Sequence, residues 1–184
     1  MEYKGLTTVI SGGQTGADQA GLLAAKSIGL RTGGTAPSGW YTDTGPNILL
    51  KSFGLSAEGD YRSRTIANVR NSDGTILLSL TLNSPGSKLT RNEARRQGKP
   101  FFEYDISELM ELSAGSDDFL NYTAARKALA TKIQNWILEN QVQILNVAGN
   151  REKDTKHFST THLVQAILME AFVRVKADDI ETGF

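Results

Sequence analysis

The stretch Leu6-Thr7-Thr8-Val9-Ile10-Ser11-Gly12-Gly13-Gln14-Thr15-Gly16-Ala17-Asp18 decides the fold. Residues 6–11 are apolar and β-branched, which is typical of a short buried strand. Residues 12–16 form a glycine-rich loop, and a helix is predicted over residues 17–28 because small residues recur there at helical spacing. The stretch therefore predicts a buried strand that turns through glycines directly into a helix packed close to a sheet.

The rest of the chain repeats this alternation of strands and helices. Further strands are predicted over residues 75–80, 101–104 and 142–147, and helices over 61–71, 87–97, 122–140 and 159–176. Residues 31–45 are turn-rich with a short strand at their start, residues 45–50 open a short helix, and residues 105–121 are acidic and predicted irregular. The pattern predicts an α/β fold, a Rossmann-like three-layer sandwich with a mainly parallel sheet flanked by helices. We expect residues 1–184 to form one such domain.

Composition excludes several classes of function. The chain has 20 Lys and Arg against 20 Asp and Glu, so its net charge of zero argues against non-specific binding of nucleic acid. It has no cysteine, which excludes disulfides, thiolate nucleophiles and cysteine-bound metals. His157 and His162 are five residues apart and no third ligand is near, so we expect no metal site. Without a signal peptide or a membrane span, we expect a cytoplasmic protein.

The loop after the first strand is the strongest candidate for a binding site. The first amides of a helix have no partner inside the helix, and with the helix dipole they favour phosphate. The candidate binding residues here are Gly12, Gly13, Gln14, Thr15, Gly16 and Asp18. The loop matches neither the P-loop nor the full dinucleotide fingerprint, which argues against an ATPase. The sequence supports equally well a tight structural turn in which Asp18 only favours the dipole.

Other candidates follow later strands. Gly86, Ser87 and Thr90 begin the helix after the second clear strand, where Ser87 could instead be a simple N-cap. Arg64 and Asn68 belong to a polar run, and arginine suits phosphate contact. Gly149, Asn150 and Arg151 follow the last strand. Basic residues gather in 61–100 and acidic ones in 101–120, either as solvated faces or as a basic rim around an anion site. Ligands of such sheets bind at the carboxyl ends of the strands, where these loops converge.

Several motifs taken together resemble one known family. Residues 9–18, 33–39, 61–75, 89–90 and 145–152 occur in the order and spacing of the molybdenum carrier proteins. The resemblance implies a Rossmann-like fold, a homo-oligomer (dimer or tetramer), and binding of molybdenum cofactor or a similar phosphorylated heterocycle at the glycine-rich loops, without catalysis. That cofactor is a pterin with a terminal phosphate and a dithiolene that holds the metal, so a protein without cysteine can carry it.

The same superfamily includes cytokinin-activating phosphoribohydrolases, which leaves alternatives open. Their Gly-Gly-x-Gly-Thr-x-x-Glu signature is replaced here by residues 85–90, and the position of the catalytic glutamate falls on Thr90. Glu93, one turn further on, is the candidate catalytic residue if the chain hydrolyses nucleoside monophosphates. A third hypothesis is a nucleotide-sensing module that acts through a partner.

Overall fold

A six-stranded parallel sheet forms the centre of the computed structural model, which describes residues 3–114, 119–155 and 158–177. The sheet has the order β5-β2-β1-β8-β6-β7. Its strands are β1 Thr8–Ser11, β2 Arg31–Ala36, β5 Leu55–Ala57, β6 Gly74–Ser79, β7 Phe101–Asp105 and β8 Ile144–Gly149. The chain runs from β1 to one edge through β2 and β5, then crosses to β6 and β7 and returns to insert β8 beside β1. The carboxyl ends of β1, β8 and β6 are therefore neighbours.

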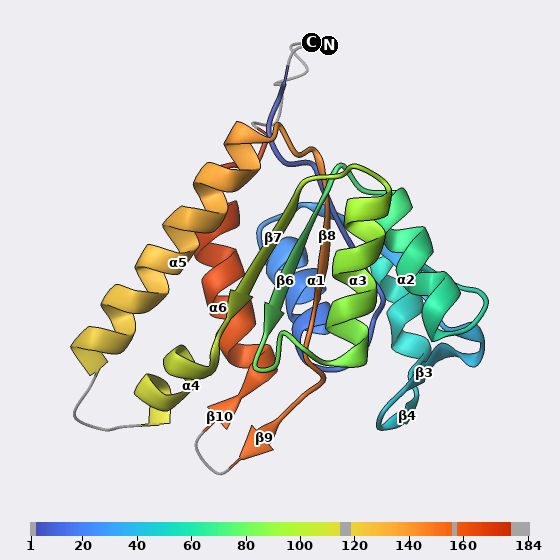
Figure 1. Cartoon of the computed structure of the whole chain (residues 1–184), viewed down its shortest axis with the longest axis horizontal. Helices are drawn as coiled ribbons and strands as arrows, with labels where there is room; N and C mark the ends of the chain where they lie inside the picture. The colour runs from blue at the N-terminus through green and yellow to red at the C-terminus, as the bar shows by residue number, and fades with distance from the viewer. Residues whose placement is uncertain (1–2, 115–118, 156–157, 178–184) are drawn as a thin grey trace.

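Helices cover both faces of the sheet, so the three-layer Rossmann-like prediction is confirmed (Figure 1). On one face lie α1 Ala17–Ser27, α5 Phe119–Glu139 and α6 Thr160–Phe172. On the other, α2 Tyr61–Arg70 and α3 Pro85–Arg96 pack side by side. The small residues of α1 are buried in the main core, and Gly21 lies against Val147 of β8. The close approach of this helix to the sheet is as predicted.

Residues 31–57 contain more regular structure than the turn-rich prediction. β2 uses six residues, and β5, which the sequence analysis missed, pairs with it in parallel. Between them lie the 3-10 helices η1 Ser38–Trp40 and η2 Ile48–Phe53 and a hairpin of β3 Tyr41–Thr42 and β4 Gly45–Pro46. Asn47 caps η2 by accepting a hydrogen bond from the Leu49 amide. The short helix expected over residues 45–50 begins only at Ile48, because Gly45–Pro46 form β4, and it continues to Phe53.

The prediction of an irregular segment over residues 105–121 is wrong for its described part. Residues Ser107–Ala114 form the helix α4, and α5 begins at Phe119 rather than at residue 122. The Asp105 carboxylate accepts a hydrogen bond from the Ser107 amide, and Ile106 and Leu109 are buried in the core. Burial of these two apolar side chains stabilises a segment whose acidic composition suggested a loop.

The remaining differences concern ends of elements. α6 ends at Phe172 instead of 176, because the chain turns there and the Leu6 amide donates to the Val175 carbonyl. β9 Asp154–Thr155 and β10 Phe158–Ser159 form a small antiparallel pair before α6. Within the described ranges, no helix combines the length and the apolarity that crossing a membrane requires.

Candidate functional site

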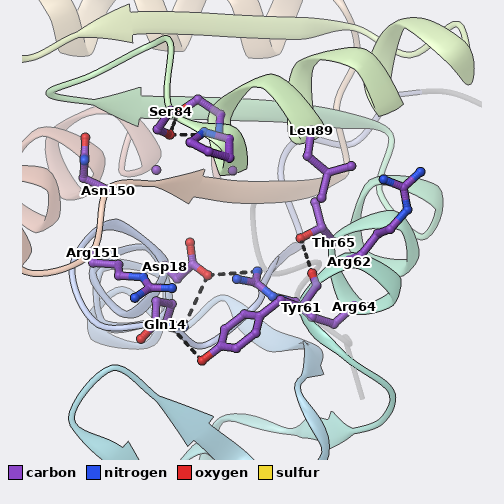
Figure 2. Close-up of a pocket in the computed structure, with 14 residues that line it drawn as sticks. Gln14, Asp18, Tyr61, Arg62, Arg64, Thr65, Ser84, Leu89, Asn150 and Arg151 are labelled. Carbon is purple, nitrogen blue, oxygen red and sulfur yellow. Dashed lines mark hydrogen bonds and ion pairs between the residues drawn. The ribbon is translucent and has the colours of Figure 1, made fainter.

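A cavity of about 610 Å³ opens at the carboxyl ends of β1, β8 and β6. Figure 2 shows its walls, which are the loop between β1 and α1, the first turns of α2 and α3, and the loop after β8. The lining residues are Gln14, Asp18, Tyr61, Arg62, Arg64, Thr65, Ser84, Pro85, Gly86, Ser87, Leu89, Gly149, Asn150 and Arg151. The loops that follow β1, β8 and β6 meet because these three strands are adjacent in the sheet.

A buried ion pair joins α2 to the first turn of α1. Nη1 of Arg64 lies 3.3 Å from Oδ2 of Asp18, and the two side chains are 14% and 4% exposed. The guanidinium passes directly over Gly12, where a Cβ atom would lie 1.6 Å from Nη1. Burial raises the pKa of Asp18 above its ordinary value, while Arg64 opposes that rise. Glycine at position 12 thus lets the arginine reach the aspartate.

Three amides of the first loop and the first amide of α1 already have partners inside the protein. The Gly13 amide donates to Oγ of Ser11 (3.2 Å), the Gln14 amide to Oδ2 of Asp18 (3.3 Å), and the Thr15 amide to Oε1 of Gln14 (3.0 Å). The Ala17 amide donates to the Asn150 carbonyl. The Asp18 carboxylate therefore takes the place that the sequence analysis expected for an external anion.

The hairpin of β3 and β4 is fastened to the same loop. The Asp43 amide donates to Oε1 of Gln14 (2.8 Å), and Oγ1 of Thr15 donates to the Asp43 carboxylate (2.5 Å). The Thr15 side chain is turned toward the hairpin and is not part of the cavity wall. Gly13 and Gly16 also lie outside that wall, Gly13 against Leu50 and Gly16 against the Asn150 carbonyl.

The first turn of α3, which lines the cavity, leaves one amide without a partner among the described residues. Oγ of Ser84 accepts a hydrogen bond from the Ser87 amide (3.1 Å), so Ser84 is the N-cap and the alternative that gave this role to Ser87 is wrong. Pro85 has no N–H group, and the Gly86 amide has no partner among the described residues. Nothing lies within 4 Å of a Cβ atom placed on Gly86. The Ser87 hydroxyl is buried and donates to the Thr81 carbonyl.

The loop after β8 brings the third set of groups. Oδ1 of Asn150 accepts hydrogen bonds from the Ser79 hydroxyl (2.6 Å) and from the Leu80 amide, which fixes this amide side chain between β8 and β6. Arg151 has no carboxylate within ion-pair distance among the described residues, and its Cζ lies 5.8 Å from the centre of the Tyr61 ring.

The structure brings together part of the predicted set. Lining the cavity are Gln14, Asp18, Arg64, Gly86, Ser87, Gly149, Asn150 and Arg151. Outside its wall are Gly12, Gly13, Thr15, Gly16, Asn68 and Thr90. Asn68 holds β2, since its side chain accepts from the Thr35 amide and donates to the Thr35 carbonyl, and Thr90 donates to the Gly86 carbonyl.

Glu93 also lies outside the cavity wall. Its carboxylate accepts hydrogen bonds from Nη2 of Arg96 (2.6 Å) and from Gln97, and the bond with Arg96 lowers the pKa of Glu93. Arg96 is the last residue of α3 and Gln97 is its C-cap, so both partners lie within four residues of Glu93. This arrangement keeps the Glu93 carboxylate ionised and bound to its own helix.

Several lining residues were missed by the sequence analysis as site residues: Tyr61, Arg62, Thr65, Ser84, Pro85 and Leu89. All of them lie in the first two turns of α2 or α3, except Ser84, which is the N-cap of α3. The sequence signal that could have identified these residues is the two N-caps, Asp60 and Ser84. The residues after each N-cap begin a helix at the end of the sheet where the cavity lies. In the described part of the chain, no group of three or more His, Cys, Asp or Glu side chains could hold a metal ion.

The raised pKa of Asp18 predicts a particular dependence of stability on pH. Because the folded state holds the Asp18 proton more tightly than the unfolded state, the contribution of this group to stability is greatest below its unfolded pKa of about 3.9 and is lost as the pH rises through the folded pKa. We expect the free energy of unfolding of the wild type, relative to Asp18→Asn, to fall between pH 4 and pH 8 in urea titrations. A difference that stays constant or rises over this range would contradict the assignment.

The fold and the cavity define a Rossmann-like α/β protein with arginines gathered at the carboxyl ends of its central strands. A family model described as the circularly permutated YpsA SLOG family matches residues 9–172. A solved structure of a "putative molybdenum carrier protein" from Syntrophus aciditrophicus is 31% identical, with a TM-score of 0.74, over 94% of this chain and 98% of that one. The chain belongs to the circularly permuted YpsA family of SLOG proteins, and the family resemblance seen in the sequence is confirmed. The search of curated proteins gave no match.

Proposed function

We propose that this protein binds molybdenum cofactor, or a similarly phosphorylated heterocycle, in the cavity and carries it without transforming it. The observation that carries the proposal is the charge of the cavity wall. Arg62, Arg64 and Arg151 line it, and Asp18 is the one carboxylate among the described lining residues. Asp18 is already paired with Arg64, so two guanidinium groups remain for an anionic ligand. The name of the solved relative supports the same class of cargo.

The residues present suit such a cargo. A volume of about 610 Å³ is within the range of small-molecule sites. The free Gly86 amide at the start of α3, with the Arg62 guanidinium, can bind a terminal phosphate. The dithiolene of the cofactor supplies the sulfur ligands of its metal, so the absence of cysteine from the chain is compatible with this cargo.

The placement of carboxylates supports binding without hydrolysis. N-glycosidic hydrolysis would call for a carboxylate that reaches the ligand, and Glu93, the candidate for that role, is bound to Arg96 outside the cavity wall. Asp18 lines the cavity, but its Oδ2 is engaged by Arg64 and the Gln14 amide. Adenosine monophosphate is therefore the control ligand, because release of adenine would reveal the hydrolytic alternative.

The test is an anaerobic titration of the protein with released molybdenum cofactor, using Gly86→Asp as the disabling variant. Aspartate in the first turn of a helix favours the helix dipole, so we expect α3 to remain folded. Its carboxylate would take the free amide and repel phosphate, and we expect binding to weaken by at least about tenfold. Asn92→Asp, which adds the same charge to the exposed part of α3, is the matched control and should bind as the wild type does.

Two results would overturn the proposal. The first is equal cofactor binding by Gly86→Asp and Asn92→Asp, which would show that the cofactor does not bind in this cavity. The second is preferential binding of adenosine monophosphate followed by release of adenine, measured by chromatography, which would make the protein a hydrolase.

A further inference from the structure

An aromatic side chain stands in the cavity wall without belonging to the core. Tyr61 is the first residue of α2, and the residue is 41% exposed. A reciprocal pair of hydrogen bonds between Asp60 and Ser63 fixes the backbone on both sides of it (2.7 and 2.8 Å). The position of this ring is therefore set by the helix cap and not by packing in the interior.

Two guanidinium groups lie against this ring. The Cζ atoms of Arg64 and Arg151 are each 5.8 Å from its centre, and the three side chains are seen together in Figure 2. The two arginines differ in their ion pairing. Arg64 is paired with Asp18, whereas Arg151 is exposed and has no carboxylate partner among the described residues. Arg64 is thus fixed in the wall, and Arg151 can move away from the ring without breaking an ion pair.

The Tyr61 hydroxyl is held only by long contacts. Nε2 of Gln14 donates to it over 3.4 Å, and the hydroxyl donates to the Tyr41 carbonyl over 3.5 Å. Hydrogen bonds of this length are weak. The hydroxyl therefore does little to hold the side chain in place, and Tyr61 lines the cavity as a largely exposed aromatic residue.

We propose that Tyr61 and Arg151 form a clamp for the flat ring system of the ligand. The heterocycle stacks on the Tyr61 ring, and the planar guanidinium of Arg151 closes over it, while the phosphate is bound elsewhere in the cavity. Aromatic rings and guanidinium planes both stack on heterocycles, and a lysine at the same position cannot. This inference rests on the proposed function, and it assigns selectivity for a heterocycle to these two residues.

The experiment compares phosphate esters with and without a heterocycle. Adenosine monophosphate, neopterin monophosphate and ribose 5-phosphate are titrated calorimetrically into the wild type, Tyr61→Phe, Tyr61→Leu and Arg151→Lys. We expect the wild type to prefer at least one heterocyclic ester over ribose 5-phosphate by about tenfold or more, the range that stacking on one aromatic residue gives. Tyr61→Phe should retain this preference, and Tyr61→Leu and Arg151→Lys should lose most of it.

Controls separate the clamp from general effects. Arg95→Lys, at an exposed position of α3 outside the cavity wall, should keep the preference of the wild type. Because the clamp acts as one unit, the double variant Tyr61→Leu/Arg151→Lys should lose little more than either single variant. Unchanged thermal melting of all variants excludes loss of the fold as the cause.

The clamp is overturned if the wild type shows no preference for a heterocycle, or if Tyr61→Leu keeps it. These outcomes differ from failure of the proposed function. If molybdenum cofactor does not bind but the preference depends on Tyr61, the clamp stands with another heterocyclic cargo. If the cofactor binds and Tyr61→Leu prefers the heterocyclic esters as the wild type does, only the clamp fails.

Discussion

Replacing Gly149 by alanine is expected to lower the free energy of unfolding by about 3 kcal/mol, the upper part of the usual range for overpacking. A Cβ atom there would lie 1.9 Å from the Leu78 carbonyl oxygen and 2.7 Å from the Cβ atom of Ala17. The first contact is with backbone of the neighbouring strand β6, so no side chain can turn aside to relieve it. Urea unfolding followed by circular dichroism measures the loss.

Gly86→Ala is the matched comparison, since it makes the same chemical change in the same cavity wall. Nothing lies within 4 Å of the added methyl group, and the residue is in α3, where alanine is the better helix former. We expect this variant to be more stable than the wild type by about 0.5 kcal/mol. If both alanine variants unfolded at the same urea concentration, the packing described around Gly149 would be incorrect.

Arg64→Met is expected to lower the free energy of unfolding by about 3–5 kcal/mol at neutral pH, as happens when one partner of a buried ion pair is removed. The Asp18 carboxylate, 4% exposed, would be left with backbone donors and without its counter-ion. Because the pKa of Asp18 is already raised and would rise further, proton uptake by the carboxylate becomes more favourable as the pH falls, so the loss should be smaller at pH 5 than at pH 8. Urea titrations at the two pH values measure both effects.

Two further variants test this explanation. In Asp18→Asn/Arg64→Met neither member of this pair carries a charge, so the double variant should recover part of the stability that Arg64→Met loses. Arg95→Met removes an exposed arginine from α3 and should change stability by no more than about 0.5 kcal/mol. An Arg64→Met protein as stable as Arg95→Met would show that the pair with Asp18 contributes nothing.

The same residues that hold the first loop in shape also form the cavity. Arg64 neutralises Asp18, and Asp18 in turn accepts a hydrogen bond from the amide of Gln14, a residue that the sequence analysis had placed in the ligand site. An internal carboxylate thus stabilises the turn, and the anion-binding groups left over are on α2, on α3 and after β8. This explains why glycines 12, 13 and 16 are required by the fold although they lie outside the cavity wall.

Prediction from the sequence succeeded where the signal was local. The apolar run of β1, the small residues of α1 and the polar loops after the strands are each readable within a dozen residues, and the structure has them in place. It failed for α4, because the segment is acidic and only its packing through Ile106 and Leu109 makes a helix favourable. It also missed β5, a three-residue strand that depends on pairing with β2.

What the sequence by itself determined is the alternation of strands and helices, the glycine-rich turns, and the concentration of polar groups at the carboxyl ends of strands. What only the tertiary structure decided is which of those groups meet. Arg64 pairs with Asp18 across 46 positions of chain, and Arg151 comes to Tyr61 because β8 is inserted between β1 and β6. Strand order is a property of the whole packed sheet and leaves no trace in local periodicity, so the cavity and its clamp follow from the fold and not from any single motif.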